Sequence, residues 1–195
     1  GLISLGSAVR IRPSLPINKK MKNILVTGGA GYIGSHIVED LIKKKYNVVI
    51  VDNLKTGYKK LINKKAKFYK NDILNKKIIR KIILKNEIDT IIHLAASINI
   101  TDSKKDNKLF YKNNVKGTSN LIESCKNTLI KNFIFSSSAA IYHSSNKKVK
   151  ENSLIKPKSI YGKTKLKGEK IIKKKLKKIN INYAILRYFN VVGAS

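Results

Sequence analysis

One stretch of the sequence, VTGGAGYIGSHIVEDL at residues 26–41, decides the fold class. Within it Gly29, Gly31 and Gly34 satisfy the pattern G-x-G-x-x-G, and Gly28 stands directly in front. The glycines follow an apolar run typical of a buried strand and open a helical pattern. A turn of this kind brings backbone N–H groups against a pyrophosphate at a helix N-terminus, where a Cβ atom would block the approach. The stretch therefore predicts a dinucleotide-binding loop; a glycine-rich turn without a ligand is the alternative.

An acidic residue stands where such a loop needs one. The next apolar run, NVVIVD at 47–52, ends in Asp52, eighteen residues after Gly34. A carboxylate at this place can accept both ribose hydroxyls of an adenosine and would repel a 2′-phosphate. The sequence therefore favours NAD over NADP as the cofactor.

Strand and helix patterns alternate through the rest of the chain. Short apolar runs are expected to form strands, and longer patterns with apolar residues every three or four positions are expected to form helices. The expected strands are 23–28, 47–52, 67–70, 90–96, 132–138 and 182–189. A first expected helix follows the glycines and has one apolar face, formed by Ile33, Ile37, Val38, Leu41 and Ile42. Further helices are expected at 74–86, 107–129 and 160–180. This alternation predicts an α/β fold, a doubly wound parallel-sheet Rossmann domain, over residues 21–195.

The first twenty residues lack these patterns. They contain two prolines, show no sustained period and precede Met21, the only methionine. We expect residues 1–20 to be a disordered extension or read-through outside the fold, with a transit peptide as the alternative.

The chain is strongly basic, with 42 basic and 11 acidic side chains and a net charge of +31. Such a charge is typical of proteins that bind nucleic acid or anionic membranes. Here the lysines are spread over every expected surface, and aromatic residues do not interleave with them as a base-stacking surface would require. We therefore expect no specific nucleic-acid partner. No apolar run approaches the roughly 20 residues that cross a bilayer, so no membrane partner is expected either.

Cysteine and metal-ligand patterns are also uninformative about catalysis. The single cysteine, Cys125, excludes an internal disulfide, fits a reducing cytoplasm and lies in a helical pattern, where a buried thiol is expected. No His, Asp and Glu residues have metal-ligand spacing, and no metal is predicted.

A serine run and a tyrosine–lysine pair carry the candidate chemistry. The run FIFSSS places Ser138 at the carboxyl end of an expected strand, and Tyr161 opens an expected helix with Lys165 one turn later. Residues four apart share a helix face. An ammonium nearby favours the phenolate form of a tyrosine, whose ordinary pKa is about 10, and the positive charge of a nicotinamide would add to this effect. Tyr161 could therefore act as a base, with Ser138 holding a substrate oxygen; packing and helix capping are the alternative roles.

Further motifs between residues 21 and 195 are VDNLKTG, NDI, IIHLAA, NNVKGT, FIFSSSAAIY, YGKTK and LRYFNVVGA. With the glycine loop, these motifs resemble the extended short-chain dehydrogenase/reductase superfamily and, within it, the UDP-glucose 4-epimerase branch. The resemblance implies NAD-dependent 4-epimerisation of a UDP-sugar through a 4-keto intermediate, in the cytoplasm, with Ser138, Tyr161 and Lys165 as catalytic residues. Substrate contacts are implied for Ser138, Tyr161 and Asn190.

The resemblance also implies which residues contact the cofactor. They are Gly28, Gly31, Tyr32, Ile33, Gly34, Asp52, Asn53, Asp72, Ile73, Leu94, Ala95, Ala96, Asn114, Tyr161, Lys165, Tyr188 and Phe189.

Rival activities on the same fold stay open. A sugar-nucleotide 4,6-dehydratase would carry an Asp–Glu pair after its active-site hydroxyl, but Ala139 and Ala140 follow Ser138 here. Another sugar-nucleotide enzyme of the family, or a non-catalytic NAD-binding remnant, is also an alternative. The family's smaller C-terminal substrate domain is expected to be absent, which would make this chain a truncated epimerase with impaired turnover.

Two further expectations come from the resemblance. Family members commonly form homodimers through helices equivalent to 107–129 and 160–180, so a homodimer is expected, although lysines between 163 and 178 would oppose it. His93, in IIHLAA, is expected to have a structural role.

Overall fold

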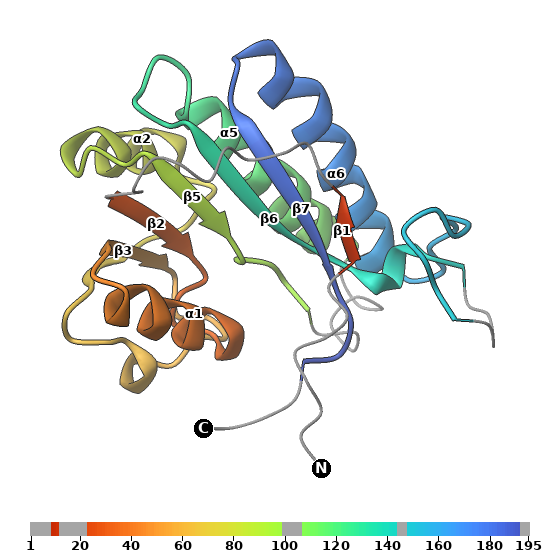
Figure 1. Ribbon diagram of the computed structural model, residues 1–195, viewed down its shortest axis with the longest axis horizontal. Coiled ribbons are helices and arrows are strands. Elements are labelled where there is room, and N and C mark those ends of the chain that lie inside the picture. Colours follow the sequence, from red (N-terminus) through yellow and green to blue (C-terminus); the bar gives the residue numbers. More distant parts are fainter. Residues whose placement is uncertain (1–8, 12–22, 99–106, 144–147, 192–195) are drawn as a thin grey trace.

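The computed structural model describes residues 9–11, 23–98, 107–143 and 148–191. They form one sheet with the strand order β1-β7-β6-β5-β2-β3-β4 (Figure 1). The strands are β1 (Val9–Ile11), β2 (Asn23–Thr27), β3 (Asn47–Asp52), β4 (Lys67–Lys70), β5 (Thr90–His93), β6 (Asn132–Ser138) and β7 (Asn182–Tyr188). All neighbouring strands are parallel except β1 and β7.

The strand order confirms the predicted doubly wound fold. The chain runs outward from β2 through β3 to β4, then returns to β5 on the other side of β2 and continues to β7. The loops that follow β2 and β5 therefore diverge from one another at the carboxyl edge of the sheet. In open α/β sheets this point, where the strand order reverses, is where ligands bind.

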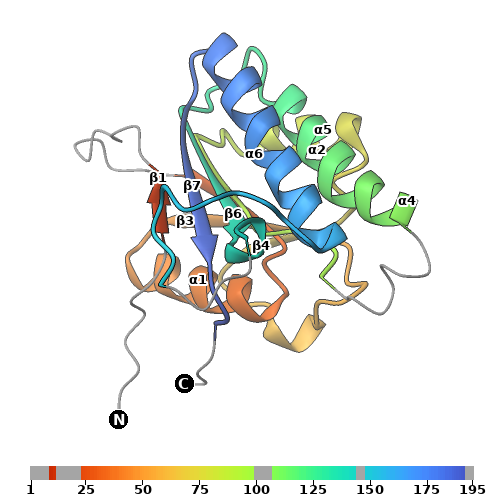
Figure 2. The same ribbon diagram turned by 90° about the vertical axis from the view of Figure 1, so that its right-hand side faces the viewer.

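Helices cover both faces of the sheet (Figures 1 and 2). One face carries α2 (Lys76–Lys85), α5 (Gly117–Ser124) and α6 (Ile160–Lys178), and the opposite face carries α1 (Tyr32–Lys43). The segment before α5 consists of α4 (Asn107–Phe110) and η2 (Tyr111–Lys116), a π-helical stretch; η1 (Lys59–Leu61) and η3 (Ala139–Ile141) are short 3-10 turns.

Each face has its own apolar core. Between the sheet and α6, the rings of Phe133 and Phe135 pack with Ile172 and Leu176. On the other face Val38 is buried among strand residues, and Ile37, Leu41 and Ile42 pack beside it half-buried. The apolar face predicted for the first helix is therefore the face that contacts the sheet.

Several predicted boundaries differ from the structure. The expected strand 90–96 ends at His93, and the expected helix 107–129 is divided into α4, η2 and α5 and ends at Ser124. The residues that follow His93 form a loop because they line a cleft rather than pair with neighbouring strands. The pattern of apolar residues does not distinguish a π-helical stretch from an α-helix.

The N-terminal segment also differs in part from its expectation. Three of its residues form β1, which pairs antiparallel with β7 through the register Val9↔Arg187 to Ile11↔Ile185. A strand at a sheet edge presents unpaired N–H and C=O groups, and β1 satisfies those of β7. The other residues of 1–20 lie outside the described residues.

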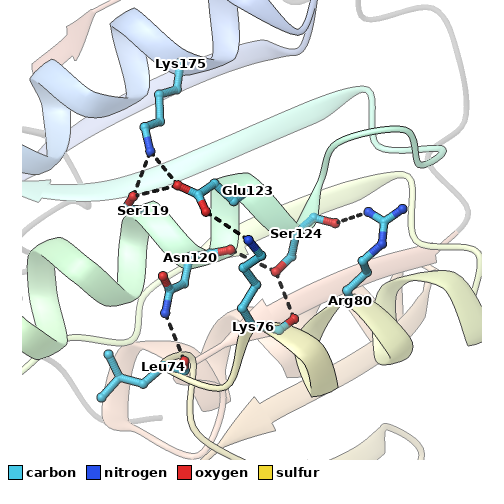
Figure 3. Close-up of polar contacts among 8 residues, drawn as sticks. All are labelled: Leu74, Lys76, Arg80, Ser119, Asn120, Glu123, Ser124 and Lys175. Carbon is cyan, nitrogen blue, oxygen red and sulfur yellow. Dashed lines mark hydrogen bonds and ion pairs between the residues drawn. The ribbon is translucent and has the colours of Figure 1, made fainter.

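A polar cluster joins the three helices of the larger layer (Figure 3). Glu123 on α5 accepts from the ammonium of Lys175 on α6 at 2.8 Å and from that of Lys76 on α2 at 3.1 Å. Ser119 accepts a further hydrogen bond from Lys175 at 2.8 Å. One carboxylate therefore lies between two lysines and reduces the repulsion between them.

Backbone carbonyls extend this contact between α2 and α5 (Figure 3). The guanidinium of Arg80 donates to the carbonyl oxygens of Ser124, at 3.3 Å, and Lys126, at 2.6 Å, where α5 ends. The Asn120 amide donates to Leu74 O at 2.9 Å. Arg80 thus satisfies carbonyl groups that a helix leaves unpaired at its C-terminus.

We predict that Glu123→Gln lowers the free energy of unfolding by about 1 kcal/mol at pH 7. Hydrogen bonds from Lys175 and Lys76 lower the pKa of Glu123 to about 2, below its ordinary value of 4.5. The stabilisation is therefore fully present above pH 4.5 and is lost as the pH falls toward 2. Urea unfolding at several pH values measures the difference between the variant and the wild type, which should shrink below pH 4.5. Glu39→Gln, which breaks the exposed pair with Lys43 on α1, is the matched control and should change little; equal losses in both variants would contradict the prediction.

Candidate functional site

A cleft of about 300 Å³ opens at the carboxyl edge of the sheet, where the strand order reverses. Gly28 and Gly31 line it from the loop after β2, and Asp52 and Asn53 line it from the end of β3. Residues 94–98, after β5, form its opposite wall. The topology therefore gathers the predicted dinucleotide residues from three strand ends.

The glycine loop requires glycine at Gly28 and Gly34. Gly28 has a φ of 77°, and a Cβ atom on it would lie 2.7 Å from Ala95 N. A Cβ atom on Gly34 would clash with the carbonyl of Gly28, so the first turn of α1 packs directly on the loop. At Gly31 the nearest atom to an added Cβ is Gly28 O at 3.3 Å. Gly31 thus leaves open the space in front of the helix.

The N-terminus of α1 fits an anion. Its N-cap is Gly31, which supplies no side-chain hydrogen bond, and the first turn contains no acidic residue. The first N–H groups of a helix have no partner within the helix and carry a partial positive charge. Because Gly31 also lines the cleft, these groups fit the pyrophosphate of a dinucleotide.

Asp52 is fixed by backbone donors. Its carboxylate accepts from Ala30 N at 3.1 Å and Leu54 N at 2.8 Å, and only 8% of the residue is exposed. A carboxylate oxygen can accept more than one hydrogen bond. Asp52 can therefore still accept hydroxyl groups from the cleft, which fits the ribose of an adenosine.

A second pair of predicted residues meets at the same edge. The Asn53 amide donates to the Asp72 carboxylate at 2.9 Å, and Leu74 N donates to the other oxygen of Asp72 at 2.9 Å. Asp72 stands between Asn71 and Ile73, which both line the cleft. Tyr32 and Ile33 are predicted cofactor residues in the first turn of α1, and neither is among the lining residues of the cleft.

The candidate catalytic residues come from β6 and α6. Ser138 ends β6, and Tyr161 lies in the first turn of α6. The hydroxyl of Ser159 accepts from Gly162 N at 3.0 Å and caps the helix. A Cβ atom on Gly162 would clash with Ala140 O, so the helix backbone lies directly against the turn that follows Ser138. This close contact brings Tyr161 and Ser138 together, as the resemblance implies.

Lys165 is buried between the sheet and the helix. Its ammonium donates to Ser136 O at 2.7 Å and lies 5.1 Å from the centre of the Phe135 ring and 5.6 Å from that of the Tyr161 ring. Burial lowers the pKa of Lys165 to about 7. Lys165 therefore connects α6 to the strand that carries Ser138.

The expected effect of Lys165 on Tyr161 is not produced by the protein's own groups. Burial raises the pKa of Tyr161 above its ordinary value of 10, and the hydrogen bond with Ser138 opposes this rise. Lys165 and a nicotinamide cation together were expected to lower this pKa toward neutrality. In the protein alone the effect of burial is larger, and burial also lowers the pKa of Lys165 to about 7. Any lowering has to come from a further positive charge.

The predicted residues after β7 lie beside the site but outside the cleft. Tyr188 pairs in register with Ser138, and Phe189 and Asn190 follow it. Tyr188 is half-buried, whereas Phe189 and Asn190 are exposed. None of the three is among the residues that line the cleft.

Sequence reasoning missed a buried ion pair beside the candidate catalytic residues. The guanidinium of Arg187 on β7 donates to both carboxylate oxygens of Glu169 on α6, at 3.0 and 2.9 Å, and about 1–2% of each side chain is exposed. Ser137, next to Ser138, donates to the same carboxylate at 2.5 Å. The signal in the sequence was that Glu169 is the single acid in a helix rich in lysine.

Other missed residues line the cleft. Asn113 precedes the predicted Asn114, and Thr56 and Gly57 follow the strand that ends in Asp52. The paired asparagines in NNVKGT and the glycine in VDNLKTG were the available signals. A Cβ atom on Gly57 would lie 3.0 Å from the Asp52 carboxylate, so this glycine lets the loop close around the acid.

The other sequence-based expectations concern residues away from the cleft. Cys125 is buried, so the predicted buried thiol is confirmed, and burial raises the pKa of this thiol to about 12. Within the described ranges, no three His, Cys, Asp or Glu side chains gather as metal ligands. In the same part of the chain, no helix has the length and apolar character needed to cross a membrane.

The fold and the cleft together define a dinucleotide-binding α/β protein. Comparison with known families is more specific: residues 24–195 match the model of the NAD dependent epimerase/dehydratase family, and the chain belongs to this family. The predicted cofactor, NAD, is the cofactor of the family.

Individual relatives agree with this assignment. The chain is 42% identical over 173 residues to the UDP-glucose 4-epimerase of Lactobacillus helveticus, a match that covers 88% of this chain and 52% of the relative. Its structure resembles that of the Thermotoga maritima UDP-glucose 4-epimerase with UDP-glucose, with a TM-score of 0.83, 36% identity and coverage of 88% and 56%. It also resembles the Brucella ovis UDP-glucose 4-epimerase in complex with NAD, with a TM-score of 0.85, 37% identity and coverage of 89% and 54%. The chain thus spans about half the length of these relatives.

We predict that Lys165→Met stabilises the protein without cofactor by about 2 kcal/mol at pH 7, because the buried charge costs more than the lost hydrogen bond contributes. The folded-state pKa of about 7 is lower than the ordinary 10.5, so the unfolded state binds more protons between these values. The wild type therefore gains stability as the pH rises from 7 to 10.5, and the advantage of the variant should shrink. Urea unfolding of both proteins across this range measures the difference. A variant that is less stable at pH 7, with a gap that does not change with pH, would contradict the prediction.

Proposed function

We propose that this chain provides the NAD-binding part and the catalytic residues of a UDP-sugar 4-epimerase. The observation that carries the proposal is the position of Ser138, Tyr161 and Lys165 at the edge of the sheet that holds the glycine cradle. The relatives named UDP-glucose 4-epimerase support the sugar class.

The residues of the cleft fit NAD. The N–H groups at the start of α1 would hold the pyrophosphate, Asp52 with Asn53 would contact the adenosine ribose hydroxyls, and Asp72 with Ile73 would flank the adenine. Bound NAD supplies a hydride acceptor that removes hydride from carbon 4 of the sugar and later returns it. The side chains of the protein have to supply the proton transfer and the orientation.

Each catalytic side chain has a defined task in this proposal. Tyr161 takes the proton from the 4-hydroxyl of the sugar and later returns it to the 4-keto oxygen. The Ser138 hydroxyl holds that oxygen in place, and Ala140 N donates to Ser138 at 3.2 Å, which fixes the side chain. Lys165 holds Tyr161 close to β6 and adds positive charge beside the phenol whenever it is protonated. The phenolate forms when further positive charge in the cleft offsets the effect of burial.

Epimerisation is favoured over 4,6-dehydration by the residues after Ser138. Elimination of the 6-hydroxyl needs an acid near this position, whereas Ala139 and Ala140 form the turn η3 here. A non-catalytic NAD-binding protein is the second candidate, because the chain spans about half the length of its relatives.

The remaining partners are also proposals. We propose a homodimer that pairs through α4, α5 and α6, which lie side by side on one surface of the molecule (Figure 2). Exposed lysines on α6 would weaken such pairing at low salt. No specific nucleic-acid or membrane partner is proposed, and a cytoplasmic location accords with the one buried thiol.

We predict that two substitutions separate cofactor binding from catalysis. Gly31→Val should abolish NAD binding because a branched side chain at this position, which lines the cleft, would crowd Gly28 O at the N-terminus of α1, whereas Lys44→Val, at the exposed C-cap of the same helix, should bind NAD as the wild type does. Tyr161→Phe should retain NAD affinity and reduce conversion of UDP-galactose to UDP-glucose by at least about 100-fold. Titration calorimetry measures NAD binding, and chromatography of the nucleotide sugars measures conversion.

The conversion assay uses this chain and a fusion to the C-terminal half of the Lactobacillus helveticus relative. Conversion that depends on Tyr161 in either protein supports the epimerase. A product lighter by one water would support the dehydratase instead. NAD binding without conversion in either folded protein would favour the non-catalytic alternative, and absence of NAD binding by the wild type would overturn the proposal altogether.

A further inference from the structure

A row of buried side chains connects the glycine loop to the neighbouring strand. Thr27, the residue before Gly28, lies with its hydroxyl 2.7 Å from Nδ1 of His93 at the end of β5. The other ring nitrogen, Nε2, lies 2.9 Å from the hydroxyl of Thr118 on α5. Thr27, His93 and Thr118 are each at most 1% exposed. His93 therefore has the structural role that the sequence analysis expected.

The direction of these hydrogen bonds is fixed. A threonine hydroxyl has one hydrogen to donate, and that of Thr118 goes to Asn114 O at 2.6 Å. Thr118 must accept from His93, so Nε2 carries the proton of the ring and Nδ1 accepts from Thr27. Burial lowers the pKa of His93 to about 3, which keeps the ring neutral near pH 7.

The row continues from Asn114 into the wall of the cleft and the catalytic helix. The Asn114 side chain accepts from Ser97 N at 2.7 Å and donates to Ser97 O at 3.1 Å. Its remaining hydrogen goes to the hydroxyl of Thr164 on α6 at 3.1 Å. Thr164 in turn donates to the carbonyl oxygen of Tyr161 at 2.8 Å.

The π-helical stretch η2 makes a second contact with Ser97. It places Asn113 and Asn114 in contact with the same residue, because the Asn113 amide donates to the Ser97 hydroxyl at 2.8 Å. Both the backbone and the hydroxyl of Ser97 are then bonded to η2. Single π-helical turns inside α-helices are frequently found at functional sites.

We propose that Thr164 is a positioning residue. It holds residues 94–97, which form one wall of the NAD cleft, in a fixed position relative to the turn of α6 that contains Tyr161. Thr164, Thr118 and His93 do not themselves line the cleft. The hydroxyl of Thr164 bonds both to Asn114, which holds Ser97, and to the backbone of Tyr161. The part of this proposal that concerns NAD affinity rests on the proposed function, whereas the part that concerns the position of Ser97 does not.

The consequence of removing this hydroxyl follows from the hydrogen-bond inventory. In Thr164→Val the Asn114 amide keeps Ser97 O but loses its second acceptor, and an unsatisfied buried donor is costly. Asn114 can recover an acceptor only by turning, which breaks its two bonds to Ser97. The wall of the cleft then becomes free to move relative to α6.

The test compares Thr164→Val with Thr164→Ser, which keeps the hydroxyl. Thr128→Val is the matched control, since the Thr128 hydroxyl donates to Cys125 O at 2.7 Å just beyond α5 and away from the cleft. We expect Thr164→Val to weaken NAD binding about fivefold or more by titration calorimetry, and Thr164→Ser and Thr128→Val to stay within about twofold of the wild type.

Hydrogen exchange provides a second measurement that does not need the cofactor. The amide of Ser97 should exchange at least about fivefold faster in Thr164→Val and at the wild-type rate in the other two variants. Unchanged Ser97 exchange in a folded Thr164→Val protein, or weakening of NAD binding in Thr128→Val as large as in Thr164→Val, would overturn the proposal. Failure of the wild type to bind NAD would sink the proposed function, while the exchange rates would still decide whether Thr164 holds Ser97.

Discussion

The burial of Lys165 is the constraint on which the rest of the site depends. An ammonium inside a protein needs a partner, and Ser136 O is the acceptor to which Lys165 donates. That hydrogen bond connects α6 to β6, the strand that ends in Ser138. Close contact between the backbones of Gly162 and Ala140 completes the connection. The position of Tyr161 follows from these two contacts, because the helix cannot shift along β6 without breaking both.

Two further sets of buried polar contacts near Lys165 also hold the strand ends in place. The Glu169–Arg187 pair holds Ser137, and the His93 row connects the glycine loop to η2. Buried ion pairs and polar rows are poor sources of stability, because desolvation offsets much of their attraction. Their hydrogen bonds are directional, however, and therefore allow only one arrangement of the strand ends. The chain places its apolar cores away from the cleft and these directional contacts next to it.

The fold was largely predictable from the sequence, and the details of the site were less so. Apolar runs and the glycines of 28–34 predict a local strand, turn and helix, and Asp52 stands at a spacing set by that unit. The Glu169–Arg187 pair was missed because the two residues lie on different elements and meet only in the folded protein. The sequence spacing placed Lys165 near Tyr161, but it could not show that burial raises the pKa of Tyr161 and lowers that of Lys165 in the protein alone.

The central claim is that Tyr161 becomes an effective base only when positive charge from the bound cofactor adds to that of Lys165. Ultraviolet titration of the phenol, taken as the difference between the wild type and Tyr161→Phe, measures its pKa with and without oxidised NAD. The account predicts a pKa above the ordinary value of 10 for the protein alone and a fall of at least about one unit when NAD is bound. A pKa that does not fall when NAD is bound would contradict it.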